Sequence, residues 1–264
     1  MRKLLLLTTL LLLLMLAVPA FAQEGTPDII GGKRVTDPAR FPFMASVHAA
    51  PATCGGSVIA PRWVLTAAHC VDGRYGTSDP RQIRVNTGAL TREGGTWTNV
   101  QAVFLEPTGL DAALLYLAEP VDVPPVALAA PLPVTEPGTI PPAPVVPVVA
   151  HFIGWGCTQR DECSPAAHLR EVAIQLSNGC AAGDICTGSR IAAIGQGDSG
   201  SPVVVGSSEI GWVQIGVTYA NNLGNPARLH TWAVDVAAIR VWIDATVADP
   251  PAAKYVLYFP ITHQ

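Results

Sequence analysis

The chain has 264 residues, of which 49% are hydrophobic and 14% are charged, and its formal net charge is −4 at neutral pH. This composition supplies enough apolar surface for a packed core, so it excludes a chain that is disordered as a whole. The mild acidity gives no reason to expect nucleic acid or an anionic lipid surface as a partner.

The first 22 residues have the pattern of a secretory signal peptide. Arg2 and Lys3 precede a leucine-rich run over residues 4–14, and Ala-Phe-Ala at 20–22 matches a signal-peptidase site. An uncleaved membrane anchor is the alternative interpretation, and no later segment is long and apolar enough to span a bilayer. We predict removal of residues 1–22 on export, a short propeptide over 23–28, and a location in the periplasm or the extracellular medium.

Short runs of β-branched and apolar residues recur between turn signals on both sides of a proline-rich stretch. The first set comprises residues 43–48, 56–59, 63–66, 82–87, 100–105 and 112–117, and the second comprises 148–154, 171–176, 202–205, 211–219 and 229–233. This rhythm predicts an antiparallel all-β sandwich or barrel. Residues 120–147 contain ten prolines, which exclude a helix and most central-strand pairing, so they are predicted to form an extended connector.

One helix is predicted near the C-terminus, over residues 233–248. Asp235 can cap its first turn. Four apolar residues then fall on one face of the helix, namely Val236, Ile239, Ile243 and Val247. Two prolines at 250 and 251 end it, and the tail over 249–264 could add an edge strand or cover an apolar patch.

All six cysteines follow the signal segment, and an even count in an exported chain favours disulfides. Six cysteines allow 15 connectivities. We predict pairing between sequence neighbours, which are Cys54 with Cys70, Cys157 with Cys163, and Cys180 with Cys186. A metal cluster is the alternative, but no C-x-x-C spacing supports zinc or redox chemistry.

The most informative segment is the run Gly-Gln-Gly-Asp-Ser-Gly-Ser-Pro at residues 195–202. Three segments upstream complete its chemistry, namely Ile-Ile-Gly-Gly at 29–32, Thr-Ala-Ala-His-Cys at 66–70 and Asp-Ala-Ala-Leu-Leu at 111–115. A serine hydroxyl is a weak nucleophile at neutral pH, so it needs an imidazole to take its proton and a carboxylate to orient that imidazole. The chain supplies His69, Asp111 and Ser199 in that order.

Through these four motifs, roughly residues 29–247 resemble the trypsin/chymotrypsin-like serine proteases. The resemblance implies an all-β fold of two six-stranded antiparallel Greek-key barrels, the first over 29–119 and the second over 148–232, followed by the C-terminal helix. It also implies a zymogen-derived, secreted serine endopeptidase that cleaves proteins or peptides through an acyl-enzyme. A monomer without metal or organic cofactor is expected.

The resemblance assigns Ser199 as nucleophile, His69 as general base and acid, and Asp111 as the group that orients the imidazole. A lone histidine or an aspartate before an apolar strand is more often structural, and here the flanking residues favour catalysis. Gly197 and Gly200 let the backbone turn sharply, and the N–H groups of Gly197 and Ser199 are the expected oxyanion hole.

Activation in this family depends on a new N-terminus. Cleavage before Ile29 would release an ammonium that pairs with Asp198, as a buried charge requires. This chain departs from the family at Asp28, because relatives usually have Arg or Lys before the cut. The activating protease therefore stays open, and so does a cut elsewhere in 23–28 followed by trimming.

The specificity pocket shows further departures. Its floor falls on Ala193, which offers no carboxylate for a basic substrate residue, with Ile194 beside it. Gly195 replaces a cysteine of many relatives, and Thr218-Tyr219-Ala220 replaces Ser-Trp-Gly. Ala227 stands at a second wall glycine. We predict cleavage after small or medium aliphatic residues.

Two rival functions remain at this point. A catalytically silent relative would use the surface of the two barrels for binding, since function lies in sites and not in folds. An esterase of the α/β-hydrolase type would need Gly-x-Ser-x-Gly and the order Ser, Asp, His. The early position of His69 and the Gly-Asp-Ser-Gly context of Ser199 argue against the esterase.

Overall fold

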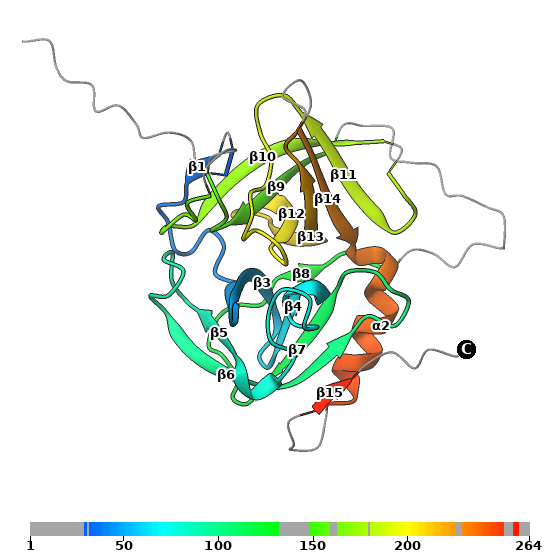
Figure 1. Ribbon diagram of the computed structural model, residues 1–264. Coiled ribbons are helices and arrows are strands. Elements are labelled where there is room, and N and C mark those ends of the chain that lie inside the picture. Colours follow the sequence, from blue (N-terminus) through cyan, green and yellow to red (C-terminus); the bar gives the residue numbers. More distant parts are fainter. Residues whose placement is uncertain are drawn as a thin grey trace, which may run out of the picture.

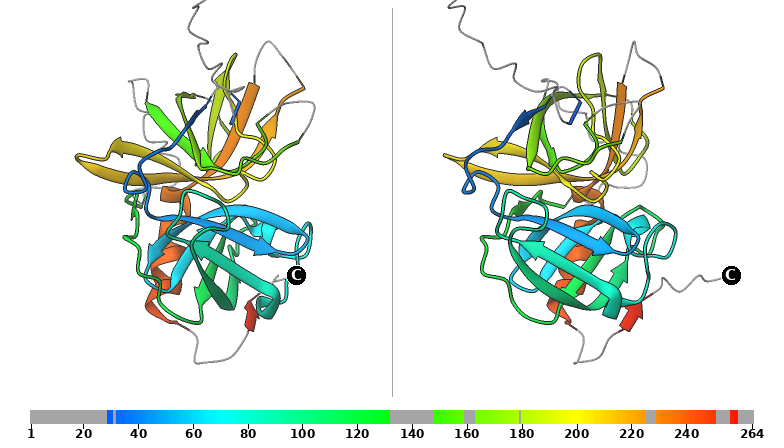
Figure 2. Two further views of the ribbon diagram at one scale, coloured as in Figure 1. Left: turned by 90° about the vertical axis from the view of Figure 1, so that its left-hand side faces the viewer. Right: turned by 60° about the vertical axis from the view of Figure 1, so that its left-hand side comes forward.

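The computed structural model describes residues 29–30, 32–131, 148–158, 163–178, 180–224, 229–250 and 256–258, the last group by its backbone alone. Two closed six-stranded antiparallel barrels lie one above the other, with a C-terminal helix along one side (Figure 1). Figure 2 shows the same stacking from two further directions. The all-β, two-barrel architecture expected from the sequence is confirmed.

The first barrel occupies the N-terminal half of the chain. Its strands are β2 (Met44–Ala49), β3 (Ala52–Ala60), β4 (Trp63–Thr66), β5 (Ile83–Thr87), β6 (Thr96–Leu105) and β7 (Ala113–Leu117). The sheet runs β6-β5-β2-β3-β4-β7, and the pairing of β6 with β7 closes it. Alternate residues such as Val47, Val85 and Leu115 are fully buried inside, as expected when one face of each strand points to the core.

The second barrel contains β9 (Val149–Gly154), β10 (Arg170–Ser177), β11 (Asp184–Ser189), β12 (Pro202–Ser207), β13 (Gly211–Asn222) and β14 (Leu229–Asp235). The pairing of β9 with both β10 and β12 closes it. Strand β11 was not expected from the sequence. Its sequence Asp-Ile-Cys-Thr-Gly-Ser lacks an apolar run, and pairing with β10 and β14 holds it in the sheet.

The N-terminal segment differs from expectation, because it packs on the second barrel and not the first. Strand β1 (Lys33–Arg34) pairs with β10. A buried carboxylate anchors the segment: Glu171 contacts Arg40 at 2.8 Å and Lys33 at 3.6 Å. Burial raises the pKa of Glu171, but hydrogen bonds from His151 and Arg40 and the charges of Arg40 and Lys33 outweigh this effect and lower it to about 2. Charge pairing thus fastens the segment beside Ile29.

Two elements tie the barrels together. Strand β8 (Ala127–Leu128), in the proline-rich connector, pairs in parallel with β13. Helix α2 (Val236–Ala248) begins where the Asp235 side chain accepts a hydrogen bond from the Ala237 N–H at 2.9 Å. Although the helix follows the second barrel, its buried residues belong to the core of the first, with Val247 partly buried against it. Connector residues 132–147 lie outside the described residues.

The C-terminal tail adds one more strand. Strand β15 (Val256–Tyr258) pairs in parallel with β6, opposite Ala102 to Phe104. The tail therefore adds an edge strand to the sheet of the first barrel, which is one of the two roles expected for it from the sequence. Within the described part of the chain, no helix is long and apolar enough to cross a membrane.

Candidate active site

His69 and Asp111 meet at one end of the first barrel. His69 lies in a short 3-10 turn (Ala68–Cys70) that follows β4, and the disulfide between Cys70 and Cys54 fastens this turn to β3. Asp111 precedes β7, the neighbour of β4 in the sheet. Its carboxylate accepts the His69 backbone N–H at 2.8 Å and lies 2.7 Å from Nδ1 of the same residue. The two contacts fix both the position and the tilt of the imidazole.

The electrostatic surroundings keep Asp111 ionised. Burial raises the pKa of its carboxyl, but the hydrogen bonds and charge of His69, with a further contribution from Arg74, lower it below the usual value. A guanidinium nitrogen of Arg74 lies 3.6 Å from Asp111 and makes a closer contact, at 2.6 Å, with Asp72. Beside it, Tyr75 presents its ring edge-on to His69 at a centroid distance of 5.4 Å.

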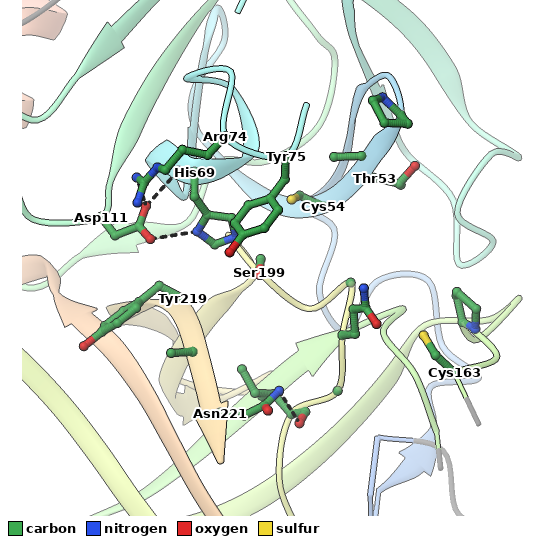
Figure 3. Close-up of a pocket in the computed structure, with 18 of the residues that line it drawn as sticks. Thr53, Cys54, His69, Arg74, Tyr75, Asp111, Cys163, Ser199, Tyr219 and Asn221 are labelled. Atoms are coloured by element: carbon green, nitrogen blue, oxygen red, sulfur yellow. Dashed lines mark hydrogen bonds and ion pairs between the residues drawn. The ribbon is translucent and has the colours of Figure 1, made fainter. Parts of the chain in front are cut away.

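Ser199 reaches the same site from the loop before β12. Its carbonyl accepts the Gly55 N–H at 2.8 Å, so the loop is bonded to β3 of the first barrel. Gly200 follows with φ of 80°, and a Cβ there would lie 2.2 Å from Thr66 Oγ1 and 2.4 Å from the Gly55 carbonyl. Only glycine fits this close approach. Figure 3 shows Ser199 and Asp111 flanking the His69 ring.

Unpaired backbone donors lie next to Ser199. Gly197 has φ of 94°, a conformation that favours glycine. Among the described residues, the N–H groups of Gly197 and Ser199 have no hydrogen-bond partner, whereas their neighbours are bonded: Cys157 N–H donates to the Gln196 carbonyl at 2.7 Å and Asp198 N–H to Gly195 at 3.2 Å. Two free N–H groups beside a hydroxyl suit an oxygen that gains negative charge.

Asp198 is buried beneath this loop. Its carboxylate accepts the Gly156 N–H at 2.7 Å and the Gly195 N–H at 2.8 Å. Burial nevertheless outweighs these bonds and raises its pKa to about 6. Gly195 stands where many relatives have a cysteine. A Cβ here would lie 2.0 Å from the Cys157 carbonyl, so this backbone leaves no room for any side chain at this position.

Ile29 lies in the same barrel as Asp198. Its side chain is fully buried in a cluster with Phe152 and Ile194, and the next residue pairs with Ala193, whose N–H donates to the Ile30 carbonyl at 3.1 Å. In the uncleaved chain Ile29 has φ of 40°, which is unfavourable for a β-branched residue. Asp28 lies outside the described residues.

A cleft of about 720 Å³ contains His69, Asp111 and Ser199. Of the predicted pocket residues, Ile194, Tyr219 and Ala220 line it. Ala193 and Thr218 are fully buried and do not, and Ala227 lies outside the described residues. The Thr218 hydroxyl lies 2.5 Å from the Asp198 carbonyl and 3.0 Å from that of Ser201, so it braces the Ser199 loop from behind.

Sequence reasoning missed several residues of the cleft. Asn221 ties its two walls together by donating from Nδ2 to the Ile194 carbonyl at 3.2 Å, and Tyr219 donates its hydroxyl to Asp184 at 2.9 Å. Further residues that line the cleft are Thr53, Arg74, Tyr75, Arg92, Cys163 and Gln196. Arg74 and Tyr75 follow His69 closely, which was a usable signal, whereas Arg92 lies in a turn with no local pattern.

The structure contains three disulfides, Cys54–Cys70, Cys157–Cys163 and Cys180–Cys186. Cys54, His69 and Cys70 form a compact group with potential metal-ligand atoms within 4.8 Å of one another. Both sulfurs of this group are bonded to each other, so neither is a free thiolate to hold a metal.

Comparison with known proteins agrees with this geometry. Residues 29–243 match the family model described as Trypsin. Testisin of Homo sapiens is 28% identical over 275 residues, which cover 89% of this chain and 85% of the relative. Azurocidin of Sus scrofa is 30% identical over 241 residues, which cover 85% of this chain and 90% of the relative. Tryptase of Mus musculus is 32% identical over 230 residues, which cover 75% of this chain and 80% of the relative.

Proposed function

Since the chain belongs to the trypsin family of serine proteases and is a serine endopeptidase of the trypsin type, we propose that it is secreted and cleaves peptide bonds through an acyl-enzyme on Ser199. The observation that carries this proposal is the His69–Asp111 pair at 2.7 Å in one cleft with Ser199. The geometry therefore adds to the sequence resemblance, because an imidazole held by a carboxylate in the same cleft as a serine can activate the serine hydroxyl.

The proposed reaction assigns each group one task. His69 takes the proton of Ser199 as the oxygen attacks the substrate carbonyl, and it later gives that proton to the leaving amine. Asp111 orients the imidazole and stabilises its cationic form. The free N–H groups of Gly197 and Ser199 receive the oxyanion, and each such donor contributes about 3–4 kcal/mol to transition-state stabilisation. Water then hydrolyses the acyl-enzyme by the same route.

We also propose activation by cleavage before Ile29. A cut there would remove the strained φ of Ile29 and create an ammonium in the barrel that holds the unpaired Asp198 carboxylate. Because the carboxylate also accepts the Gly195 and Gly156 N–H groups, the new ion pair would stiffen the loop that carries Gly197 and Ser199.

The cleft supports the proposed preference for small or medium aliphatic residues. The apolar side chains of Ile194 and Ala220 line it, and a hydrogen bond from Asn221 to the Ile194 carbonyl holds these two walls together. Asp111 is the one carboxylate among the described lining residues, and it is engaged by His69. A cationic substrate side chain would find no free partner among them.

The remaining proposals concern location and partners. The signal-like residues 1–22 support export, and residues 23–28 would be the propeptide. Substrates are proteins or peptides, and a second protease is proposed to make the activating cut because this cleft suits neither Asp28 nor a basic residue before the bond. A monomer is proposed.

A fluorophosphonate probe tests the proposal directly, because it reacts only with an activated serine. We expect labelling at Ser199 in the form that begins at Ile29, and none in Ser199→Ala. Ser201→Ala is a matched control, since Ser201 is a neighbouring buried serine whose hydroxyl has no hydrogen-bond partner among the described residues. A folded, processed protein without labelling would favour the silent binding protein instead.

A further inference from the structure

The cleft extends in two directions from Ser199. Tyr219 and Asn221 lie on one side of Ser199 in Figure 3, and Thr53 and Cys163 lie on the other. Under the proposed function, the first side holds the substrate residue whose carbonyl is attacked. The second side must then receive the residues that follow the scissile bond and leave first. Arg92, which also lines the cleft, comes from the turn that the first barrel presents to the second.

Arg92 is carried by a well-anchored turn between β5 and β6. Just before it, the Leu90 carbonyl accepts the Trp155 indole N–H at 2.9 Å and the Leu169 N–H at 2.6 Å, both from the second barrel. Just after it, the Gly95 N–H donates to the Asn86 side chain at 2.9 Å. The turn is therefore bonded on both sides, so the base of the Arg92 side chain is held in place.

Arg92 is half-buried and has no acidic partner among the described residues. The other charged lining groups are engaged, since Asp111 pairs with His69 and Arg74 pairs with Asp72. A free guanidinium in a partly enclosed cleft attracts carboxylates more strongly than one in open water, because fewer water molecules screen it.

The groups next to Arg92 leave this charge unbalanced. The charges of Arg92, Arg84 and the exposed Glu93 act on the nearby imidazole of His48. Burial lowers the pKa of His48; Glu93 raises it, the two arginines lower it, and the net shift is downward. His48 therefore stays neutral at neutral pH, and the surroundings contain two fixed cations against one anion.

We infer that Arg92 is a specificity-determining residue that selects an acidic side chain in the substrate segment following the scissile bond. This inference rests on the proposed function for the direction of the substrate. It adds a charge preference on the leaving side to the apolar preference on the acyl side. Both sides together would direct the enzyme to junctions between a small aliphatic residue and an acidic segment.

The test uses quenched fluorescent peptides with alanine before the cut and Glu, Gln or Lys at each of the three positions after it. At one of these positions we expect kcat/KM for Glu to exceed that for Gln by about fivefold, the upper end of the range for a partly exposed ion pair. Arg92→Gln should remove the difference, and Arg92→Glu should reverse it in favour of Lys. Arg84→Gln is the matched control, because Arg84 lies over the Trp97 ring at 4.7 Å and does not line the cleft.

A binding arm separates this inference from the proposed function. Ser199→Ala is titrated with the same peptides, and the Kd ratio of the Gln and Glu peptides is measured at low and high salt. A ratio that favours Glu, fades in salt and vanishes in Arg92→Gln supports the inference even if the native protein turns nothing over. Equal affinities for Glu and Gln at all three positions, or a preference that survives Arg92→Gln, would overturn it.

Discussion

At the scale of single residues, the chemistry depends on contacts that hold polar groups in one orientation. The Asp111 carboxylate accepts the backbone N–H of His69, which fixes the carboxylate beside this residue, and its contact with Nδ1 then sets the orientation of the imidazole. Arg74 adds a cation 3.6 Å from the same carboxylate. The result is a base whose orientation is set before substrate binds, which lowers the reorganisation that the reaction requires.

Replacing the nucleophile should separate folding from catalysis. Ser199→Ala removes one oxygen from a partly exposed site, so we expect the free energy of unfolding to change by less than about 1 kcal/mol. Turnover should fall by at least about 10⁴-fold, with a small residual rate from the oxyanion hole. Peptide hydrolysis and urea unfolding of the purified variant measure the two effects. Hydrolysis at the native rate by a folded variant would exclude Ser199 as nucleophile.

The cleft wall predicts which residue precedes the cut. On a peptide library, we expect the activated enzyme to prefer Ala, Val or another small or medium aliphatic residue, with soft discrimination, since one methylene changes binding by only about 1–3 kcal/mol. Ala220→Gly, which removes a methyl group from a lining residue, should shift the preference toward larger side chains. A dominant preference of the native enzyme for Arg, Lys, Phe or Tyr would contradict this assignment of the pocket.

At the scale of elements, the N-terminal segment and the Ser199 loop are expected to act together in activation. Strand β1 pairs with β10, and Arg40 and Lys33 contact the buried Glu171, so the segment that follows Ile29 is already docked on the second barrel. Asp198 is buried, and no cation lies within ion-pair distance of its carboxylate among the described residues. The cleavage before Ile29 therefore needs to rearrange little beyond the first residues of the chain.

The two N-terminal forms should differ in activity. We expect the form that begins at Gln23 to be about a hundredfold less active than the form that begins at Ile29, because only the latter has an ammonium to pair with Asp198 and order the oxyanion donors. Both forms are made from cleavable fusions and verified by N-terminal sequencing before the assay. Asp198→Asn in the Ile29 form should lower activity similarly. Equal specific activity of the two native forms would rule out this activation mechanism.

At the scale of the whole molecule, the site exists only where the two barrels meet. His69 and Asp111 come from the first barrel, and Ser199 comes from the second. A buried hydrogen bond of 2.6 Å from Ser57 to Gln214 joins β3 to β13, and the Gly55 N–H bonds the Ser199 carbonyl. Helix α2 also packs into the core of the first barrel, so the C-terminal end of the chain holds the halves in register.

In the uncleaved molecule, the contribution of Asp198 to stability should decrease as the pH rises. Burial raises the pKa of Asp198 to about 6, above its value in an unfolded chain, so the native state binds more protons between pH 4 and 6. Across this window we expect Asp198 to cost about 3 kcal/mol of unfolding free energy. Urea unfolding of the form that begins at Gln23, in a Ser199→Ala background, measures this trend.

The control for this prediction is the same protein with Asp198→Asn, because other acids such as Glu171 produce an opposite trend at lower pH. The difference in unfolding free energy between the two proteins should change across pH 4–6 and be flat above it. After cleavage before Ile29, the change should reverse sign, since an ammonium partner favours the ionised carboxylate. A pH-independent difference in the uncleaved form would contradict the burial effect.

The amino-acid sequence by itself determined the features that depend on local pattern. The rhythm of short apolar runs predicted most strands of both barrels, and Asp235 with its apolar face predicted helix α2. Motif chemistry singled out His69, Asp111 and Ser199. These signals are readable because strand periodicity, helix capping and a Gly-Asp-Ser-Gly turn each involve residues within a few positions of one another.

Only the tertiary structure decided which distant segments face each other. Strand β11 has no apolar run of its own, and the pairing of β1 with β10 joins residues far apart in the sequence. Arg92 reaches the cleft because the second barrel holds its turn through Leu90. Burial, charge pairing and close approach between barrels act through space, so no local pattern records them, and the walls of the cleft became visible only in the folded chain.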